Sequence, residues 1–271
     1  MSLIGIIASS RLQAWTPAIL TGLKAWYDAS DTGTISVTGN AVTQWNDKST
    51  NAYNVTQGTG AKQPQSGTTT LNGKNVIAFD GGDRLVAASA ANWKFLHDGS
   101  SSLVGMVIKF SSVSDPNQLL TAMSTEDAAD TTKIGASFNL EDRVAASLNN
   151  ANRCAVVKGT GGQYVVLQDN NNAITPNSAT VITHLIDADN GTAADRWASY
   201  IGTGSALKAN TQTNAVSTSN PSYALNIGWN QGETYSGVTG FIAEVVIVSG
   251  ADATDTNRVL LRDYLSAKWG L

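Results

Sequence analysis

The carboxylates of this chain are the residues best suited to chemistry, and cleavage of a glycan is the reaction to test them against. A glycosidase places two carboxylates on either side of the sugar bond, about 5 Å apart when it retains the anomeric configuration. On one strand such a pair falls at alternating positions, because side chains two residues apart share a face. Glu244 lies alone in the apolar run FIAEVVIVS. The other candidates are adjacent in the sequence or lie in a polar stretch, and they are Glu126, Asp127, Asp130, Glu141 and Asp142. No strand offers the pair, so we predict that the protein is not an enzyme.

The histidines and the cysteine give no second route to catalysis. His97 follows the segment NWKFL, and His184 lies in the apolar run VITHLID. Neither belongs to a Ser/His/Asp elbow or to a zinc-ligand spacing. We expect His184 to be a histidine of the core or of a sheet face. Cys154 is the one cysteine, so it forms no internal disulfide, and we expect it to be a small buried residue.

A calcium site is the better metal candidate, although we predict no cofactor. The segment DADNGTAAD gathers three carboxylates, from Asp187, Asp189 and Asp195. It departs from the EF-hand pattern, because its glycine comes one place early and no glutamate closes the loop. Asn190-Gly191 explains the segment without metal, since this pair favours a type I′ hairpin turn. We therefore predict that strands at 180–187 and 196–201 pair, with calcium as the alternative.

Four further aspartates fall at the ends of predicted strands. There a carboxylate can accept hydrogen bonds from backbone N–H groups two residues on, in an Asx-type turn. We predict this structural role, rather than calcium binding, for Asp28, Asp31, Asp47 and Asp80.

Sugar binding needs an exposed aromatic ring with amide or carboxylate groups beside it. The segment NIGWNQGETYSG supplies such a group of residues in a predicted loop: Trp229, Asn230, Gln231 and Tyr235. Trp93, in AANWKF, is a second candidate ring. The alternative is that Trp229 packs at the rim of the fold.

The amino-acid composition limits which classes of protein this chain can belong to. The chain has 271 residues, of which 42% are hydrophobic, so it can bury a sizeable core. Only 14% are charged and the formal net charge is -4. Without a cluster of Lys and Arg, nucleic acid is not an expected partner. No apolar run reaches the length of about 18 residues that a membrane-spanning helix needs.

The chain begins with the apolar segment MSLIGIIASSRLQAW. No basic residue precedes its apolar stretch, as one would in a secretory signal, so we expect it to stay uncleaved. We predict that residues 1–20 form an arm that docks on a partner through Leu3, Ile4, Ile6, Ile7 and Trp15. The alternative is that this arm folds back to cover an edge of its own domain.

The rest of the chain predicts about a dozen short strands separated by turn residues. This pattern is typical of an antiparallel sandwich or barrel. The run at 102–110 is apolar throughout, as in a strand buried on both faces. We expect residues 58–73 to form a polar loop.

The end of the chain predicts one helix. Apolar residues recur there at helical spacing, at Leu261, Tyr264, Leu265 and Trp269. Asp252 or Thr254 can cap the start of the helix, and Gly270 can end it. We expect the opposite face, with Arg258, Arg262, Asp263 and Ser266, to face water.

Recognisable sequence motifs occur near the start of the predicted β-domain and at the end of the chain. Near the start stand LKAWYDASDTGTI, VTQWNDKSTNAYNVTQ and LNGKNVIAFDGGDRL, and the chain closes with GFIAEVVIVSGADATDTNRVLLRDYLSAKWGL. Together they resemble the laminin-G-like, concanavalin A-like jelly-roll domains of bacterial surface proteins and tailed-phage particle proteins. The resemblance implies an all-β antiparallel jelly-roll sandwich over residues 21–271, with a C-terminal helix that covers a sheet margin. It also implies that the first and last strands are neighbours. The expected core anchors are Trp26, Trp45, Phe79, Phe241 and Trp269.

The opening LIGIIASS is similar to the short starts of some phage tail and virion proteins. The combined expectation is a non-enzymatic virion protein of a tailed bacteriophage, either a tail-fibre or receptor-binding component or a capsid decoration. Its expected partners are other virion proteins, copies of itself and host-surface glycans. The alternative is a bacterial secreted or surface lectin-like carbohydrate-binding module.

Overall fold

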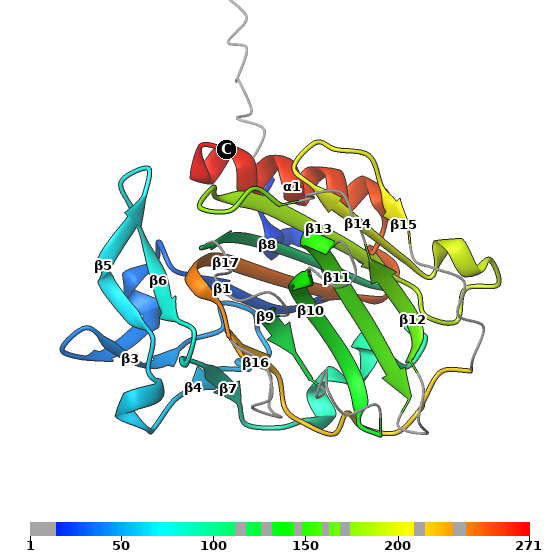
Figure 1. The fold of residues 1–271 in the computed structure, drawn as a ribbon, viewed down its shortest axis with the longest axis horizontal. Coiled ribbons are helices and arrows are strands. Elements are labelled where there is room, and N and C mark those ends of the chain that lie inside the picture. The colour runs from blue at the N-terminus through cyan, green and yellow to red at the C-terminus, as the bar shows by residue number, and fades with distance from the viewer. Residues whose placement is uncertain are drawn as a thin grey trace, which may run out of the picture.

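The protein is a two-layered antiparallel β-sandwich with one C-terminal α-helix (Figure 1). A computed structural model describes residues 15–111, 118–125, 132–143, 148–158, 163–168, 174–208, 215–229 and 237–271, and the statements below refer to these. The predicted fold class is confirmed. Besides the strands and α1 there are short 3₁₀ helices: η1 (Pro17–Ile19), η2 (Thr32–Thr34), η3 (Gly60–Lys62), η4 (Ala91–Leu96), η6 (Ala193–Asp195) and η7 (Gly250–Asp252).

The first layer runs in the order β15-β14-β13-β8-β17-β1. The expected adjacency of the first and last strands is confirmed by the pairing of β1 with β17. The strands are β1 (Leu23–Asp28), β8 (Ser102–Phe110), β13 (Thr180–Ile186), β14 (Trp197–Ile201), β15 (Leu207–Lys208) and β17 (Thr239–Ser249).

The second layer runs in the order β12-β11-β10-β9-β16-β7-β4-β3-β2. Its strands are β2 (Ile35–Thr38), β3 (Ala41–Trp45), β4 (Val55–Thr56), β7 (Leu85–Ala87), β9 (Gln118–Ser124), β10 (Ile134–Arg143), β11 (Leu148–Lys158), β12 (Gln163–Gln168) and β16 (Asn226–Ile227).

A hairpin joins the two layers at one margin. It consists of β5 (Gln65–Leu71) and β6 (Lys74–Asp80), and it projects at the left of Figure 1. β6 pairs with the first half of β17, and β5 meets β3 at the pair Ala41 and Gln65. The expected polar loop at 58–73 is therefore wrong for its second half. Asn72 and Gly73 have φ of 49° and 78°, which is the left-handed conformation that a tight hairpin turn requires.

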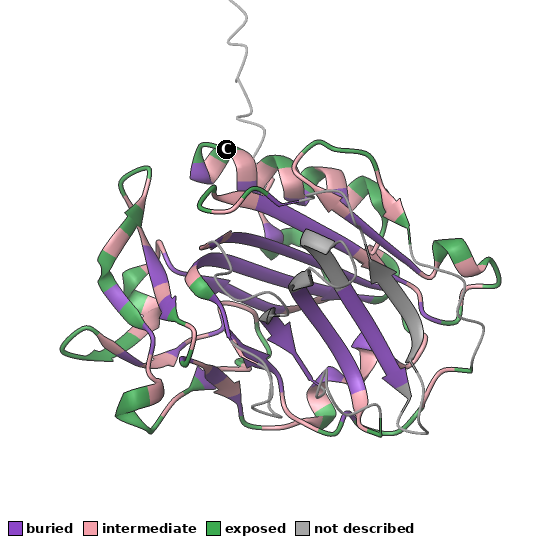
Figure 2. Ribbon diagram, in the orientation of Figure 1, coloured by how far each residue is buried: buried purple, intermediate pink, exposed green. Residues whose placement is uncertain are grey.

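Two apolar clusters explain why the sequences of the central strands β8 and β17 are almost continuously hydrophobic. One cluster fills the space between the layers, and the other lies between the first layer and α1. Because β8 and β17 contribute to both, they are buried on both faces, as predicted for 102–110 (Figure 2). The five expected core anchors are all buried: Trp26, Trp45, Phe79, Phe241 and Trp269.

Helix α1 (Asp255–Trp269) begins and ends as its sequence predicts. The Thr254 side chain accepts a hydrogen bond from the backbone N–H of Asn257 at 3.2 Å, and Gly270 ends the helix with φ of 70°. The helix lies on β8 and β13 rather than on a sheet margin, which corrects the expectation. It comes close to the sheet at Gly105, where an added Cβ would lie 2.6 Å from Leu261 Cδ2.

The predicted exposure of Arg258 is wrong. Its side chain is buried, with the guanidinium 3.6 Å from the centre of the Tyr200 ring and Nε 2.6 Å from Asp255 Oδ1. A guanidinium on an aromatic face with a carboxylate beside it can leave bulk water at little cost.

The predicted turn at Asn190-Gly191 is also wrong, although the predicted strands do pair, with Ile186 opposite Trp197. Neither Asn190 nor Gly191 has a positive φ, so there is no type I′ turn. The connection is wider and contains η6. Arg196 Nε donates to the Asn190 carbonyl at 2.9 Å, and this contact holds the wider loop.

A buried carboxylate lies where β1, β17 and α1 meet. Glu244 is fully buried, on a strand that is otherwise apolar. Such a group is costly to bury unless donors surround it. Both of its oxygens are occupied. The four donors are Trp26 Nε1 at 2.7 Å, Tyr264 Oη at 3.2 Å, Trp269 Nε1 at 2.6 Å and Lys268 Nζ at 2.7 Å.

Asp28 lies directly opposite Glu244 in the β1–β17 pairing. Like charges in this position repel, and Lys268 resolves the conflict by lying 2.7 Å from both carboxylates. Burial acts to raise the pKa of Asp28, but hydrogen bonds from Lys268, Ser30 and Lys48 outweigh it and hold that pKa below its usual value. Burial raises the pKa of Glu244, in spite of Lys268.

Candidate functional site

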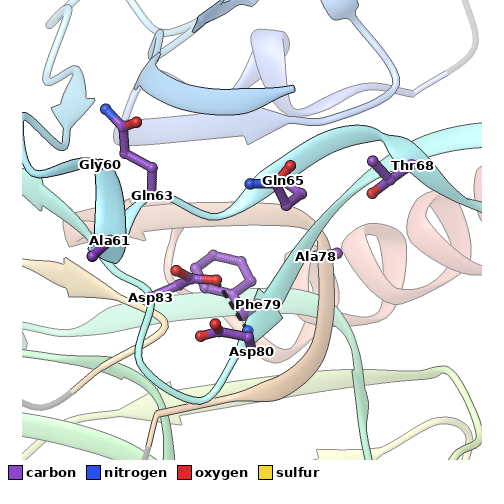
Figure 3. Close-up of a pocket in the computed structure, with 9 residues that line it drawn as sticks. All are labelled: Gly60, Ala61, Gln63, Gln65, Thr68, Ala78, Phe79, Asp80 and Asp83. Carbon is purple, nitrogen blue, oxygen red and sulfur yellow. Dashed lines mark hydrogen bonds between the residues drawn. The ribbon is translucent and has the colours of Figure 1, made fainter. Parts of the chain in front are cut away.

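A pocket opens between η3, the β5–β6 hairpin and the loop that follows β6 (Figure 3). Its volume is about 270 Å³. Two carboxylates, two amides and one hydroxyl line it, so we name it the carboxylate–amide pocket. The lining residues are Gly60, Ala61, Gln63, Gln65, Thr68, Ala78, Phe79, Asp80 and Asp83.

The loop after β6 positions both carboxylates. β6 ends at Asp80, which is paired with Thr239 of β17. Asp80 Oδ1 accepts the backbone N–H of Gly82 at 2.8 Å, and the backbone N–H of Asp80 donates to Asp83 Oδ2 at 3.0 Å. This turn brings the two carboxyl groups to one side of the pocket (Figure 3). Asp83 is buried and Asp80 is exposed.

Asp83 holds its proton more tightly than an ordinary aspartate. Burial raises its pKa to about 6, in spite of the hydrogen bond from the Asp80 backbone. The neighbouring charge of Asp80 acts in the same direction as burial, and the pKa of about 6 is the net result. The Asp83 carboxyl group lies beside Asp80, since its Oδ2 accepts the Asp80 backbone N–H.

The neutral groups of the pocket come from η3, β5 and β6. Gln63 Nε2 donates to the Gln57 carbonyl at 2.7 Å, which fixes this amide. Gln65 and Thr68 are exposed on β5. The Phe79 ring lies against the backbone of Gly228 and behind the Asp83 carboxyl group (Figure 3). The pocket thus presents one fixed amide, a second amide and a hydroxyl group beside a largely buried aromatic ring.

A second pocket, of about 340 Å³, lies beside the β4–β7 pair. Its lining residues carry no charge. They are Ala52, Tyr53, Asn54, Thr56, Ala87, Ala88 and Asn92.

The predicted sugar-binding residues fall at the edge of what the structure describes. Asn230, Gln231 and Tyr235 lie outside the described residues. Trp229 is half-buried, with its ring against Gly237. Glycan contact by these four residues stays a prediction. The other candidate ring, Trp93, is fully buried, so it cannot be an exposed platform.

The predicted docking arm is described only in its last part. Leu3, Ile4, Ile6 and Ile7 lie outside the described residues. Trp15 is half-buried, with its ring centre 5.9 Å from that of Tyr264 on α1, and Leu20 is buried in the cluster beneath α1. Residues 15–20 therefore pack on the sandwich, and docking of the segment before them stays a prediction.

Two of the three aspartates that could have held calcium have protein partners. Asp187 accepts Asn190 Nδ2 at 2.9 Å, and Asp195 pairs with Lys208 at 2.5 Å. Within the described ranges, no group of three or more His, Cys, Asp or Glu side chains could hold a metal ion.

The predicted Asx-type turns are confirmed at three aspartates. Asp28, Asp47 and Asp80 accept backbone N–H groups two residues on, from Ser30, Ser49 and Gly82. Asp31 instead forms an ion pair with Lys48 at 2.8 Å.

His184 and Cys154 lie in the core, as predicted. His184 Nδ1 accepts a hydrogen bond from Trp197 Nε1 at 3.2 Å. Complete burial lowers the pKa of His184 to about 3, so the ring is neutral. In the described part of the chain, no helix has the length and apolar character needed to cross a bilayer.

Comparisons with known proteins support the fold and leave the family open. No protein-family profile matches the chain, and no curated protein matches it in sequence. Domain 4 of AbnA, a GH43 extracellular arabinanase from Geobacillus stearothermophilus solved in complex with arabinotriose, is similar in structure. Its TM-score is 0.52 at 15% identity, over 89% of this chain and 98% of that domain.

A sialidase from Trypanosoma rangeli matches with a TM-score of 0.50 at 10% identity. The match covers 90% of this chain but only 33% of the sialidase chain. At these identities the likeness shows a shared β-sandwich fold.

We predict that Asp83→Asn stabilises the protein above pH 6. A carboxyl group whose pKa is raised on folding contributes stability below its ordinary pKa and loses that contribution as the pH rises through the raised value. The variant should gain on the order of 1 kcal/mol in the free energy of unfolding at pH 7.5 and nothing at pH 3.5. Denaturant unfolding measures both, with Asp189→Asn, an exposed aspartate, as control. An equal change at both pH values would contradict the account.

Proposed function

We propose that this protein is a non-catalytic carbohydrate-binding module and that the carboxylate–amide pocket receives the sugar. The observation that carries the proposal is the pocket itself. Its amide, hydroxyl and carboxylate groups, with the Phe79 ring beside them, can exchange hydrogen bonds with the hydroxyl groups of a saccharide. At about 270 Å³, the pocket lies just below the usual range of about 300–1,000 Å³ for ligand sites, so we expect it to take one sugar unit of a chain.

The fold supports this proposal. The arabinanase domain that shares the sandwich was solved in complex with arabinotriose. A shared fold does not carry a shared function, so the argument for this chain rests on its own pocket.

The geometry of the carboxylates supports a binding role over a catalytic one. A glycosidase needs room for the sugar bond between its two carboxylates, which lie about 5 Å or more apart. Asp80 and Asp83 instead belong to one turn and lie on the same side of the pocket, so they do not flank a sugar bond from opposite sides (Figure 3). Glu244 is occupied by its four buried donors.

We further propose that the module belongs to a tailed-phage particle, as a tail-fibre, receptor-binding or capsid-decoration protein. The apolar segment of Leu3, Ile4, Ile6 and Ile7 would attach it to a neighbouring virion protein. Each aliphatic side chain buried in this way contributes about 1.5–3 kcal/mol. Trp15 fixes the start of the described chain beside α1, so the arm would leave the sandwich from that side. A bacterial secreted or surface lectin-like module remains the alternative.

We predict that substitutions in the pocket weaken saccharide binding. Gln65→Ala and Thr68→Ala each remove an exposed polar side chain of the pocket lining and should leave the fold intact. Isothermal titration with the best ligand of a glycan array should show a loss of roughly tenfold in affinity for each variant, about 1.4 kcal/mol. Asn92→Ala, in the second pocket, is the matched control and should bind as the unmodified protein does. Equal affinity for all four proteins would place the sugar elsewhere.

We predict that a chain lacking residues 1–14 folds but does not join particles. The deletion keeps Trp15 and its contact with Tyr264, so the melting temperature should change little. Mass spectrometry of purified virions should detect the full chain and not the shortened one. Incorporation of both would refute docking through the arm, and absence of the full chain from any particle would favour the lectin-like alternative.

A further inference from the structure

The carboxylate–amide pocket carries negative charge that its lining does not balance. Asp80 and Asp83 lie side by side, and none of the nine lining residues is a lysine or an arginine. Another close pair of carboxylates has its charge balanced by a lysine, because Lys268 lies 2.7 Å from both Asp28 and Glu244. The pocket lacks such a bridge among its described residues, and it is open to solvent.

The charges around Asp83 come from few elements. Asp80, on β6, is the charged group that acts on it. Lys62 ends η3 and Arg84 follows Asp83, and the Arg84 backbone N–H donates to the Lys62 carbonyl at 3.0 Å. Both cations flank the pocket, but neither lines it.

We propose that the ligand of this pocket is a saccharide bearing a protonated amino group, whose ammonium lies between Asp80 and Asp83. The inference rests on the proposed function and names the class of sugar. An ammonium offers three donors, and it would supply for these carboxylates the bridge that Lys268 supplies for Asp28 and Glu244. Gln65 and Thr68 remain for the sugar hydroxyl groups.

Other charge classes of ligand fit this lining less well. An acidic sugar would place a third negative charge beside two carboxylates, one of them buried, where repulsion is strong. Calcium takes about six to eight oxygen ligands, with several carboxylates in tight sites, and the lining supplies two carboxylates. A neutral sugar leaves the like charges unpaired.

The pocket geometry makes binding depend on pH with a definite sign. An ammonium between the two groups requires an ionised Asp83, so at a pH below about 6 binding must release a proton from this side chain. Affinity should fall by roughly tenfold per pH unit below that value, and it should level off above it until the amine of the sugar loses its own proton.

The test compares three matched oligosaccharides by isothermal titration: oligomers of glucosamine, of N-acetylglucosamine and of galacturonic acid. Titrations at pH 5, 6 and 7 use buffers of different ionisation enthalpy, so that released protons are counted. We expect glucosamine oligomers to bind at least tenfold tighter than acetylated ones, with proton release at pH 5, and galacturonate oligomers not to bind.

The variants separate a local effect from a general charge effect. Asp83→Asn keeps the acceptor for the Asp80 N–H, and Asp80→Asn keeps the acceptor for Gly82. Each should reduce the preference for the amine to less than threefold. Asp189→Asn removes the same charge from an exposed turn and should leave the preference unchanged. A parallel loss in all three variants would show attraction to the acidic protein as a whole and would overturn the inference.

The remaining outcomes keep the two proposals apart. Equal or tighter binding of acetylated oligomers, weakened by Gln65→Ala, would overturn the amino-sugar inference and leave a carbohydrate-binding pocket. Binding of Ca²⁺ alone that is lost in Asp83→Asn would also overturn it. Failure of every saccharide to bind would refute the proposed function itself.

Discussion

The structure depends on one buried carboxylate, Glu244, and on the donors that surround it. A charged side chain on a strand buried on both faces costs several kcal/mol unless its oxygens are satisfied. Two indoles, a phenol and an ammonium satisfy them, and these donors come from β1 and α1. Removing any one partner would leave polar atoms buried without hydrogen bonds, so these contacts specify how the helix sits on the sheet. Apolar packing around Leu261 and Gly105 then fixes its distance.

Strand β17 transmits this constraint to the pocket. Its second half holds Glu244 and pairs with β1, while its first half pairs with β6, whose last residues are Phe79 and Asp80. The strand that forms one wall of the pocket, β6, is therefore hydrogen-bonded to the same strand, β17, that carries Glu244. The two carboxylates of the core, Asp28 and Glu244, are paired with Lys268, whereas the lining of the pocket has two carboxyl groups and no lysine or arginine.

The sequence predicted the sandwich, the adjacency of its ends and the helix, because these depend on local periodicity and capping. The motif Asn-Gly predicts a tight turn at Asn190, where a contact with Arg196 instead holds a wider loop. The same motif forms a tight hairpin turn at Asn72, within the segment expected to be a polar loop. The pocket itself could not be predicted, since Gln63, Gln65 and Asp83 meet only through the pairing of β5, β6 and β17. Glu244 did stand out as a lone acid in an apolar strand. Its partners lie 20 to 25 positions away on the helix, or 218 positions away on β1, so they depend on strand register and helix docking.

A double-mutant cycle between Glu244 and Lys268 tests most directly whether the cluster locks α1 onto the sheet. Denaturant unfolding would compare the unmodified protein with Glu244→Gln, Lys268→Met and the double variant at pH 7. Each single variant leaves a buried partner unsatisfied, so the account predicts a coupling energy of about 1.5–3 kcal/mol. It also predicts that each single variant loses more free energy of unfolding than the removal of an exposed ion pair would cost. Additive losses, with coupling below about 0.5 kcal/mol, would contradict it.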